Sequence, residues 1–271
     1  MKIGLCAAAC AFAANAPCFA ESAPVYYLEA LHALDEGRTI SAIDWYTKAI
    51  RLNPDFAEAY LGRGHLYFQE EAYERALSDY NKGIGKSVGG PAAYNNRALI
   101  HYELENYEKS IKDFTRSIRL RPDTGNTYYN RGKSYYATSR YEKSLDDFLT
   151  AARLNPGDTF AFYYTATALH DLGDYKRSVK NYDRAIKVDA GNVAAFAKRA
   201  RSLYREGRIR EAMEDFDQAL ELQSDYWRAF LYRGHCRFHM GEFASAAADF
   251  LRFLKSLNAD GRPLYGGIFR P

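Results

Sequence analysis

The chain has 271 residues, and its 37 Lys and Arg residues nearly balance its 34 Asp and Glu residues, which leaves a net charge of +3. A balance so close to neutral gives no reason to expect a nucleic-acid partner. The sequence also lacks a glycine-rich phosphate loop, a nucleophile elbow and a paired-carboxylate signature, so we expect neither catalysis nor a bound cofactor.

The first twenty residues have the features of a bacterial secretory signal. An apolar run over residues 3–14 follows a single lysine, and small residues precede the cleavage position. We therefore expect residues 1–20 to be a signal peptide cleaved after Ala20, and the mature protein to be periplasmic; the alternative is a cytosolic chain with a frayed N-terminus. The apolar run is too short to span a bilayer, so no transmembrane segment is expected. A lipid anchor is disfavoured, because Ala7 stands where a lipoprotein signal has leucine, three residues before Cys10.

Residues 23–260 divide into seven rows of 34 residues without insertion or deletion. The rows are 23–56, 57–90, 91–124, 125–158, 159–192, 193–226 and 227–260. The fourth and twenty-fourth places are aromatic in every row, namely Tyr26, Tyr60, Tyr94, Tyr128, Phe162, Phe196 and Phe230, and Tyr46, Tyr80, Phe114, Phe148, Tyr182, Phe216 and Phe250. The eighth and twentieth places are small, namely Ala30, Gly64, Ala98, Gly132, Ala166, Ala200 and Gly234, and Ala42, Ala76, Ser110, Ser144, Ser178, Ala212 and Ala246. We expect both aromatic columns to be core and the small places to be points where two helices approach closely.

This period and pattern resemble those of the tetratricopeptide repeat (TPR) family. The resemblance implies an all-α fold in which each row is a helix-turn-helix and seven rows stack into a right-handed α-α superhelix, or solenoid. Because no row can bury both faces of its hairpin alone, we expect one continuous array over residues 23–260, followed by a non-helical tail over residues 261–271. Glycine at the break between the two helices suits a left-handed helix end in four rows, at Gly37, Gly173, Gly207 and Gly241.

Arginine and aspartate occur together in the rows. Five rows carry arginine at the seventh place and aspartate at the twenty-third, and the other two rows, 23–56 and 159–192, lack both. The arginines are Arg63, Arg97, Arg131, Arg199 and Arg233, and the aspartates are Asp79, Asp113, Asp147, Asp215 and Asp249. A complete match of this kind predicts an ion pair between the two helices of each hairpin, so these arginines are interpreted as structural.

The family resemblance places the ligand-binding groove on the first helix of each row, at places 2, 5, 6, 9, 12 and 13. In the C-terminal half, aromatic residues at such places are accompanied by basic ones, which suits an extended peptide with acidic groups or a C-terminal carboxylate. The candidate groove residues are Tyr129, Lys133, Tyr136, Phe160, Tyr163, Tyr164, His170, Lys198, Arg201, Tyr204, Arg205 and Arg228. The alternative is that the aromatic residues pack within their own row and the basic residues only solvate the wall.

These observations favour a non-enzymatic scaffold that binds a protein or peptide partner in the cell envelope. A rival is a binder of an anionic polymer, polysaccharide or nucleic acid, through residues 198–210. A third interpretation is a zinc enzyme built on His235 and His239, which lie four residues apart, although two histidines alone do not complete a zinc site. Cys236, between them, is expected to be buried and inert.

The last row is atypical, because Phe253 stands at the twenty-seventh place, which is small in the six other rows. A bulky residue there predicts the end of the array. We also expect the tail to fold over the last row or to dock a second subunit, which would make a homodimer.

Overall fold

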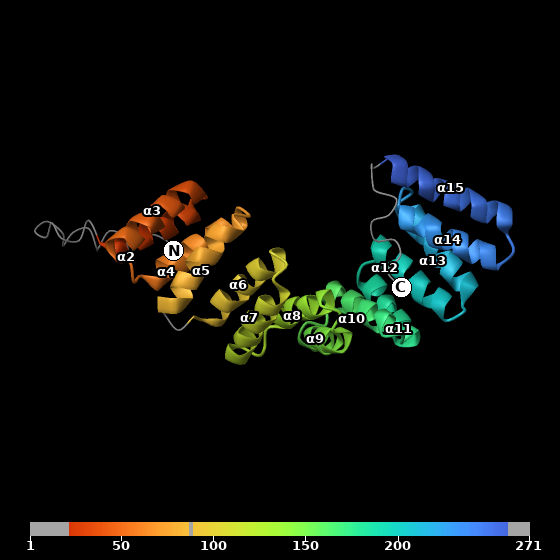
Figure 1. The fold of residues 1–271 in the computed structure, drawn as a ribbon, viewed down its shortest axis with the longest axis horizontal. Coiled ribbons are helices and arrows are strands. Elements are labelled where there is room, and N and C mark those ends of the chain that lie inside the picture. The colour runs from red at the N-terminus through yellow and green to blue at the C-terminus, as the bar shows by residue number, and fades with distance from the viewer. Residues whose placement is uncertain (1–21, 87–88, 260–271) are drawn as a thin grey trace, which may run out of the picture. The chain divides into compact units, whose positions relative to one another are not determined.

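A computed structural model describes residues 22–86 and 89–259 of the chain, which contain fourteen α-helices and no strand. The helices form seven successive hairpins (Figure 1), which confirms the predicted all-α repeat fold. They are α2 (Ala23–Asp35), α3 (Thr39–Leu52), α4 (Ala57–Gln69), α5 (Tyr73–Lys86), α6 (Pro91–Glu103), α7 (Tyr107–Leu120), α8 (Gly125–Ala137), α9 (Tyr141–Leu154), α10 (Thr159–Asp171), α11 (Tyr175–Val188), α12 (Val193–Arg205), α13 (Ile209–Leu222), α14 (Trp227–His239) and α15 (Phe243–Ala259).

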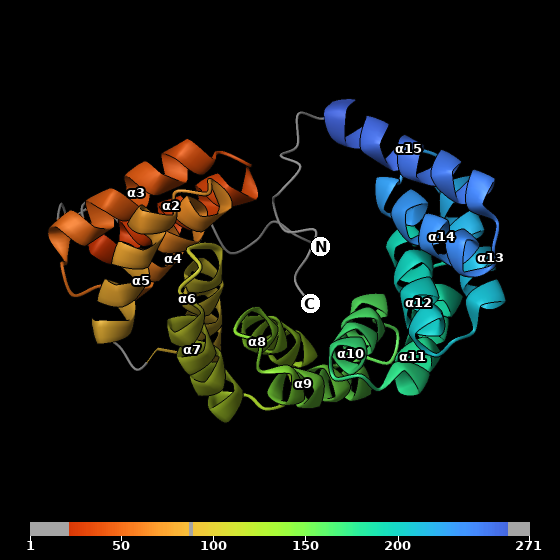
Figure 2. The same cartoon turned by 45° about the vertical axis from the view of Figure 1, so that its right-hand side comes forward.

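Contacts within the chain divide it into two compact units, of which the first contains α2 to α7 and the second α8 to α15. Within each unit the two helices of a hairpin pack against each other, and the second helix also contacts the first helix of the next hairpin. In the second unit α12 contacts both α10 and α14, and these three helices line the inner side of that unit's curve (Figure 2). Side chains from three successive first helices therefore share one wall.

The twenty-fourth place forms the core of each hairpin. Six of its seven aromatic residues are at most 2% exposed, namely Tyr46, Tyr80, Phe114, Phe148, Tyr182 and Phe216. The small residues at the eighth and twentieth places are buried in every row, so the two helices of each hairpin approach closely around the ring. The sequence prediction is confirmed for these three columns except at Phe250, which is half-buried.

The fourth place differs from the prediction. Tyr60 and Phe230 are buried there, but the other five rings are only half-buried. In the five rows with arginine at the seventh place, the guanidinium carbon lies over this ring, 5.5 to 5.9 Å from its centroid. The fourth and seventh places are neighbours on one helix face, so in these five rows the ring packs against the arginine, whether the ring is buried, as Tyr60 and Phe230 are, or half-buried.

All five predicted arginine and aspartate pairs are present. Each arginine donates from Nε and Nη2 to the two carboxylate oxygens of its aspartate, at 2.6 to 2.9 Å. The aspartates are buried, so each pair is a two-bonded ion pair between the helices of one hairpin.

Four of these arginines also reach the preceding hairpin, which the sequence did not predict. Nη1 donates to a side chain at the twenty-fifth place of the row before, as in the 2.7 Å bonds from Arg199 to Asp183 and from Arg233 to Asp217. Arg63 and Arg97 make the equivalent bonds to Thr47 and Asn81 at 2.9 Å. One guanidinium therefore connects three helices.

The break between the two helices of every hairpin uses a left-handed residue at the fifteenth place. The four predicted glycines have φ of +73° to +82° there. In the three remaining rows Glu71, Glu105 and Ser139 adopt the same conformation, with φ of 56° to 59°. The backbone bonds are equivalent too: Gly207 and Glu105 each donate to the carbonyl three residues before, so the helix-ending motif is retained without glycine.

Replacing Glu105 with glycine is expected to stabilise the first unit by about 0.5 to 1 kcal/mol, because a Cβ in the left-handed region is strained. The matched control is Gly207→Ala, which places a Cβ in the same conformation and is expected to destabilise the second unit by about 1 kcal/mol. Urea denaturation followed by circular dichroism measures both changes. A lower stability of Glu105→Gly would show that the glutamate side chain stabilises this turn.

The last hairpin ends the described part of the chain. Phe253 is buried and contacts Trp227, with ring centroids 5.7 Å apart, and Leu257 packs beside it. Helix α15 has 17 residues, three more than each of the other second helices, and residues 261–271 lie outside the described residues. The expectations for the tail and for a homodimer therefore stay predictions.

Candidate ligand-binding site

The row 159–192 replaces the structural ion pair with uncharged hydrogen bonds. Thr165 Oγ1 donates to the Ala161 carbonyl at 2.7 Å, and Asn181 Nδ2 donates to the Arg177 carbonyl at 2.9 Å, so neither side chain bridges the hairpin. Instead the Thr167 and Tyr182 hydroxyls lie 2.9 Å apart. The α10–α11 hairpin is therefore linked by a hydrogen bond between uncharged side chains at this point.

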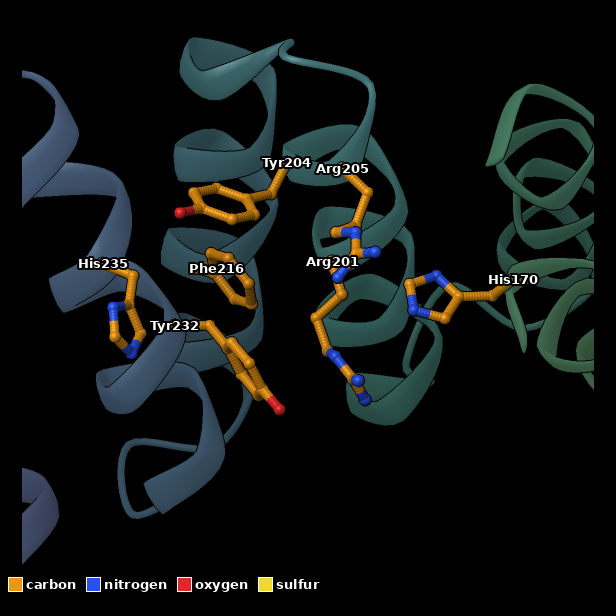
Figure 3. A pocket seen from close by; sticks show the side chains of 7 residues that line it. All are labelled: His170, Arg201, Tyr204, Arg205, Phe216, Tyr232 and His235. Carbon is orange, nitrogen blue, oxygen red and sulfur yellow. The ribbon is translucent and has the colours of Figure 1, made fainter. Parts of the chain in front are cut away.

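A cavity of about 240 Å³ opens beside this row, on the wall shared by α10, α12 and α14. Figure 3 shows Arg201 and Arg205 from α12 beside His170 from α10, and the rings of Tyr204, Phe216 and Tyr232 on the other side of the arginines. The lining residues are His170, Arg201, Tyr204, Arg205, Phe216, Tyr232 and His235. The cavity thus has basic groups at one end and aromatic rings at the other.

A smaller cavity of about 50 Å³ adjoins it and shares His170 and Arg201. Its other lining residues are Tyr136, Thr167, Asp171, Tyr182 and Lys198. The Tyr136 hydroxyl donates to the Asp171 carboxylate, and burial together with this carboxylate raises the pKa of Tyr136. The hydroxyl of Tyr136 therefore stays protonated and holds Asp171 near the cavity.

His170 stands between the two cavities. Its Nδ1 lies 2.9 Å from Ser202 Oγ, and its ring meets Tyr175 edge-on at 5.2 Å. Burial, and then the charge of Arg201, lowers the pKa of His170 to about 4. The imidazole is therefore neutral near pH 7 and offers hydrogen bonding without a charge.

Lys198 and Arg201 are half-buried cations without a carboxylate at ion-pair distance among the described residues. The Lys198 ammonium lies 3.5 Å from Thr167 Oγ1 and 5.0 Å from the centroid of the Tyr163 ring, and Arg201 lies 4.8 Å from the centroid of Tyr232. Burial, and then Arg201, lowers the pKa of Lys198 to about 8. The structural arginines of the seventh place are also shielded from water, but each has its aspartate.

The structure brings together about half of the predicted groove residues. His170, Arg201, Tyr204 and Arg205 line the larger cavity, and Tyr136 and Lys198 line the smaller one. Phe160 is 60% exposed and lies outside both linings, as does Arg228, which stacks on Trp227 at 4.9 Å.

The remaining predicted aromatic residues are packing residues. Tyr129 and Tyr164 both contact the buried ring of Phe148, with centroids 5.9 and 5.5 Å away, and Lys133 lies 6.0 Å from Tyr129. Tyr163 contacts Tyr164 and the buried Tyr182, so it is half-buried, whereas a ligand-binding place in the groove implies a ring that faces solvent. These rings pack against buried aromatic residues of their own or the preceding row, and they line neither cavity.

Sequence reasoning missed several lining residues. Tyr232, His235, Thr167 and Asp171 occupy places 6, 9, 9 and 13 of their rows, which are groove places of the family, and that position was the available signal. Phe216 belongs to the core column and contributes only the floor of the larger cavity, since it is fully buried.

The histidines proposed for zinc contact aromatic rings. His235 lies 5.3 Å from Phe250 and His239 lies 5.5 Å from Tyr204, measured between ring centroids. Across residues 22–86 and 89–259, no three His, Cys, Asp or Glu side chains are placed to hold a metal ion. Cys236 is fully buried, and burial raises the pKa of its thiol to about 12, which agrees with an inert cysteine. None of the described helices has the length and apolar character needed to cross a membrane.

Solved structures with this fold are repeat proteins. The crystal structure of YrrB, a TPR protein with an unusual peptide-binding site, is 23% identical, has a TM-score of 0.62 and covers 68% of this chain and 95% of its own. A tetratricopeptide repeat protein from Parabacteroides merdae is 20% identical and has a TM-score of 0.63; the match covers 86% of this chain and 93% of that protein. The C-terminal part of a TPR repeat-containing protein from Cytophaga hutchinsonii is 13% identical and has a TM-score of 0.70; the match covers 88% of this chain and 96% of that structure.

Family models give the same result from the sequence. Models of the TPR repeat and the tetratricopeptide repeat match residues 34–70, 57–85, 91–124, 125–158, 166–192 and 197–260. The sequence has no match among proteins of curated function. With matches in both units and the paired-helix fold, the chain belongs to the tetratricopeptide repeat family.

Proposed function

We propose that this protein is a non-enzymatic scaffold that binds a protein or an extended peptide at the two adjoining cavities of its second unit. The observation that carries the proposal is the placement of Lys198 and Arg201 beside the cavities. Both are half-buried, and neither has a carboxylate at ion-pair distance among the described residues. Shielding a cation from water without a counter-ion costs free energy, and a carboxylate of the ligand would offset this cost by pairing with the cation. The likeness to a peptide-binding TPR protein supports the same function.

The proposal is tested by affinity capture on the immobilised protein, followed by mass spectrometry. We expect Arg201→Glu to reduce the captured partner at least tenfold, because it replaces an attractive charge with a repulsive one inside the site. Arg210→Glu is the matched control, since Arg210 is exposed, on α13, and outside both cavities. Equal capture by wild type and Arg201→Glu would refute the proposal, and equal losses from both variants with a steep salt dependence would favour an anionic polymer.

We also propose that the protein works in the periplasm, on the basis of the apolar run and small residues before Glu21. N-terminal sequencing of the native protein is expected to begin at Glu21, in the fraction released by osmotic shock. Recovery of an intact Met1 in the cytosolic fraction would contradict export and would move the search for a partner into the cytosol.

A further inference from the structure

We propose that the two cavities are neighbouring subsites for one short peptide segment: the smaller binds a carboxylate between Lys198 and Arg201, and the larger binds a bulky apolar side chain. This inference rests on the proposed function and names the chemistry that the site selects. It differs from a general groove interaction, because it requires the two groups to lie close together in the ligand.

The smaller cavity is suited to a carboxylate by its size and its donors. Its 50 Å³ exceeds the share of one water molecule, about 30 Å³, by less than a factor of two, so only a small group fits. Arg201 can present parallel N–H groups to two oxygens, while the Lys198 ammonium adds a charge from the neighbouring turn of α12. Neither cation has an ion pair among the described residues, so binding a carboxylate would not require an existing ion pair to break.

Among the described residues that line this subsite, Asp171 is the one Asp or Glu. It lines the cavity, but the hydroxyl of Tyr136 donates to it, and it forms no ion pair with Lys198 or Arg201. The hydrogen bond from α8 therefore holds Asp171 at the side of the cavity. The two cations remain available to an incoming carboxylate.

The larger cavity is suited to one bulky side chain. An engineered apolar cavity of about 150 Å³ accommodates benzene, so 240 Å³ has room for an aromatic or a large aliphatic side chain. Phe216 forms its floor and stacks on Tyr232, with centroids 6.1 Å apart and planes 11° from parallel, and Tyr204 adds a third ring. No aspartate or glutamate is among its lining residues.

The shared lining residues fix the distance between the two ligand groups. His170 and Arg201 face both cavities, so a carboxylate in one and a side chain in the other must come from the same residue or from adjacent residues. Two kinds of peptide satisfy this requirement. One ends in a bulky apolar residue with a free C-terminus, and the other has Asp or Glu next to a bulky apolar residue within the chain.

The test uses synthetic acetylated hexapeptides and isothermal titration calorimetry with the full protein. The first pair is Ser-Gly-Ser-Gly-Ser-Phe as the free acid and as the C-terminal amide. The second pair, both amides, is Ser-Gly-Glu-Phe-Gly-Ser and its Gln-Phe counterpart. In at least one pair the acid is expected to bind tenfold or more tightly than its neutral partner, because hydrogen bonds to charged groups contribute more than neutral ones. The pair that shows the difference identifies the source of the carboxylate.

One substitution in the protein and one in the peptide assign the two subsites. Lys198→Met keeps the length of the side chain and removes the charge, so it is expected to reduce the difference between acid and neutral peptide at least fivefold. Lys180→Met, on the exposed face of α11, is the control and is expected to leave that difference unchanged. Changing Phe to Ala in the better acid peptide is expected to weaken binding at least fivefold, through loss of the apolar contact.

The inference fails if neither acid is preferred over its neutral partner, if Lys198→Met leaves the preference intact, or if Phe to Ala has no effect. Such a failure is separate from failure of the proposed function, which depends on the loss of partner capture by Arg201→Glu. If capture depends on Arg201 while the hexapeptides show no preference, the scaffold function stands and the subsite assignment is wrong. Tight binding of a single-stranded oligonucleotide that is weakened by Lys198→Met would overturn the assignment to a peptide.

Discussion

Replacing Asp249 with alanine is expected to lower the free energy of unfolding by about 3 to 5 kcal/mol, the largest stability effect that the described residues predict. Asp249 is 1% exposed and accepts three hydrogen bonds, from Nε and Nη2 of Arg233 at 2.9 and 2.6 Å and from Nη1 of Arg237 at 2.8 Å. Its removal leaves two guanidinium groups at the helix interface without their acceptor. Urea denaturation followed by circular dichroism, with hydrogen exchange in α14 and α15, measures the loss.

Asp217 provides a matched control because it binds the same arginine. Its carboxylate accepts from Nη1 of Arg233 at 2.7 Å, but its side chain is 54% exposed. Exposed ion pairs contribute little, so Asp217→Ala is expected to change stability by less than about 1 kcal/mol. Equal losses for the two variants would contradict the view that burial, and not charge pairing as such, makes the aspartate of the twenty-third place structural.

Replacing Tyr163 with alanine is expected to lower the free energy of unfolding by about 2 kcal/mol, which is less than the loss for a fully buried aromatic residue. The ring is half-buried, with centroids 5.2 Å from Tyr164 and 5.7 Å from Tyr182, and it supports the Lys198 ammonium at 5.0 Å. Thermal and urea denaturation measure the effect. The assignment of Tyr163 to the groove would instead predict almost no loss, because a groove ring faces solvent.

Tyr163→Phe separates the ring from its hydroxyl. The ring contacts are kept, so the variant is expected to lie within about 0.5 kcal/mol of wild type. A loss as large as that of Tyr163→Ala would mean that the hydroxyl, and not the stacked ring, stabilises the α10–α11 hairpin.

The fold could be predicted from the sequence because the chain contains seven versions of one structural unit. Five rows carry both the arginine and the aspartate, and the other two rows carry neither. This agreement between two positions can be seen within a single sequence, and it predicts the ion pairs. The half-buried fourth place was not predictable from the pattern, since an aromatic column has the same appearance in a core and under an arginine. The left-handed conformation of Glu105 was also hidden, because the residue type does not indicate it.

The candidate site was less predictable, because it depends on what differs between rows. Lys198, Arg201 and His170 could be selected by residue type at groove places, and the structure gathers them at two cavities. Tyr129 was selected on the same grounds, yet its ring turns toward Phe148. Which neighbour an aromatic side chain contacts is decided by its rotamer and by the adjacent hairpins, and neither is specified by its place in the row.

The hydrogen bond from Nη1 of the seventh-place arginine to the preceding hairpin affects how such a chain can gain or lose whole repeats. In the second unit Arg199 meets Asp183 and Arg233 meets Asp217, so in both pairs the donor follows its acceptor by 16 residues, across the boundary between two rows. Loss of the 34 codons for residues 193–226 would bring Arg233 to Asp183, an aspartate in place of an aspartate. This contact is thus interchangeable between the two junctions, so deletion or duplication of the repeat 193–226 would leave an arginine facing an aspartate at the new boundary.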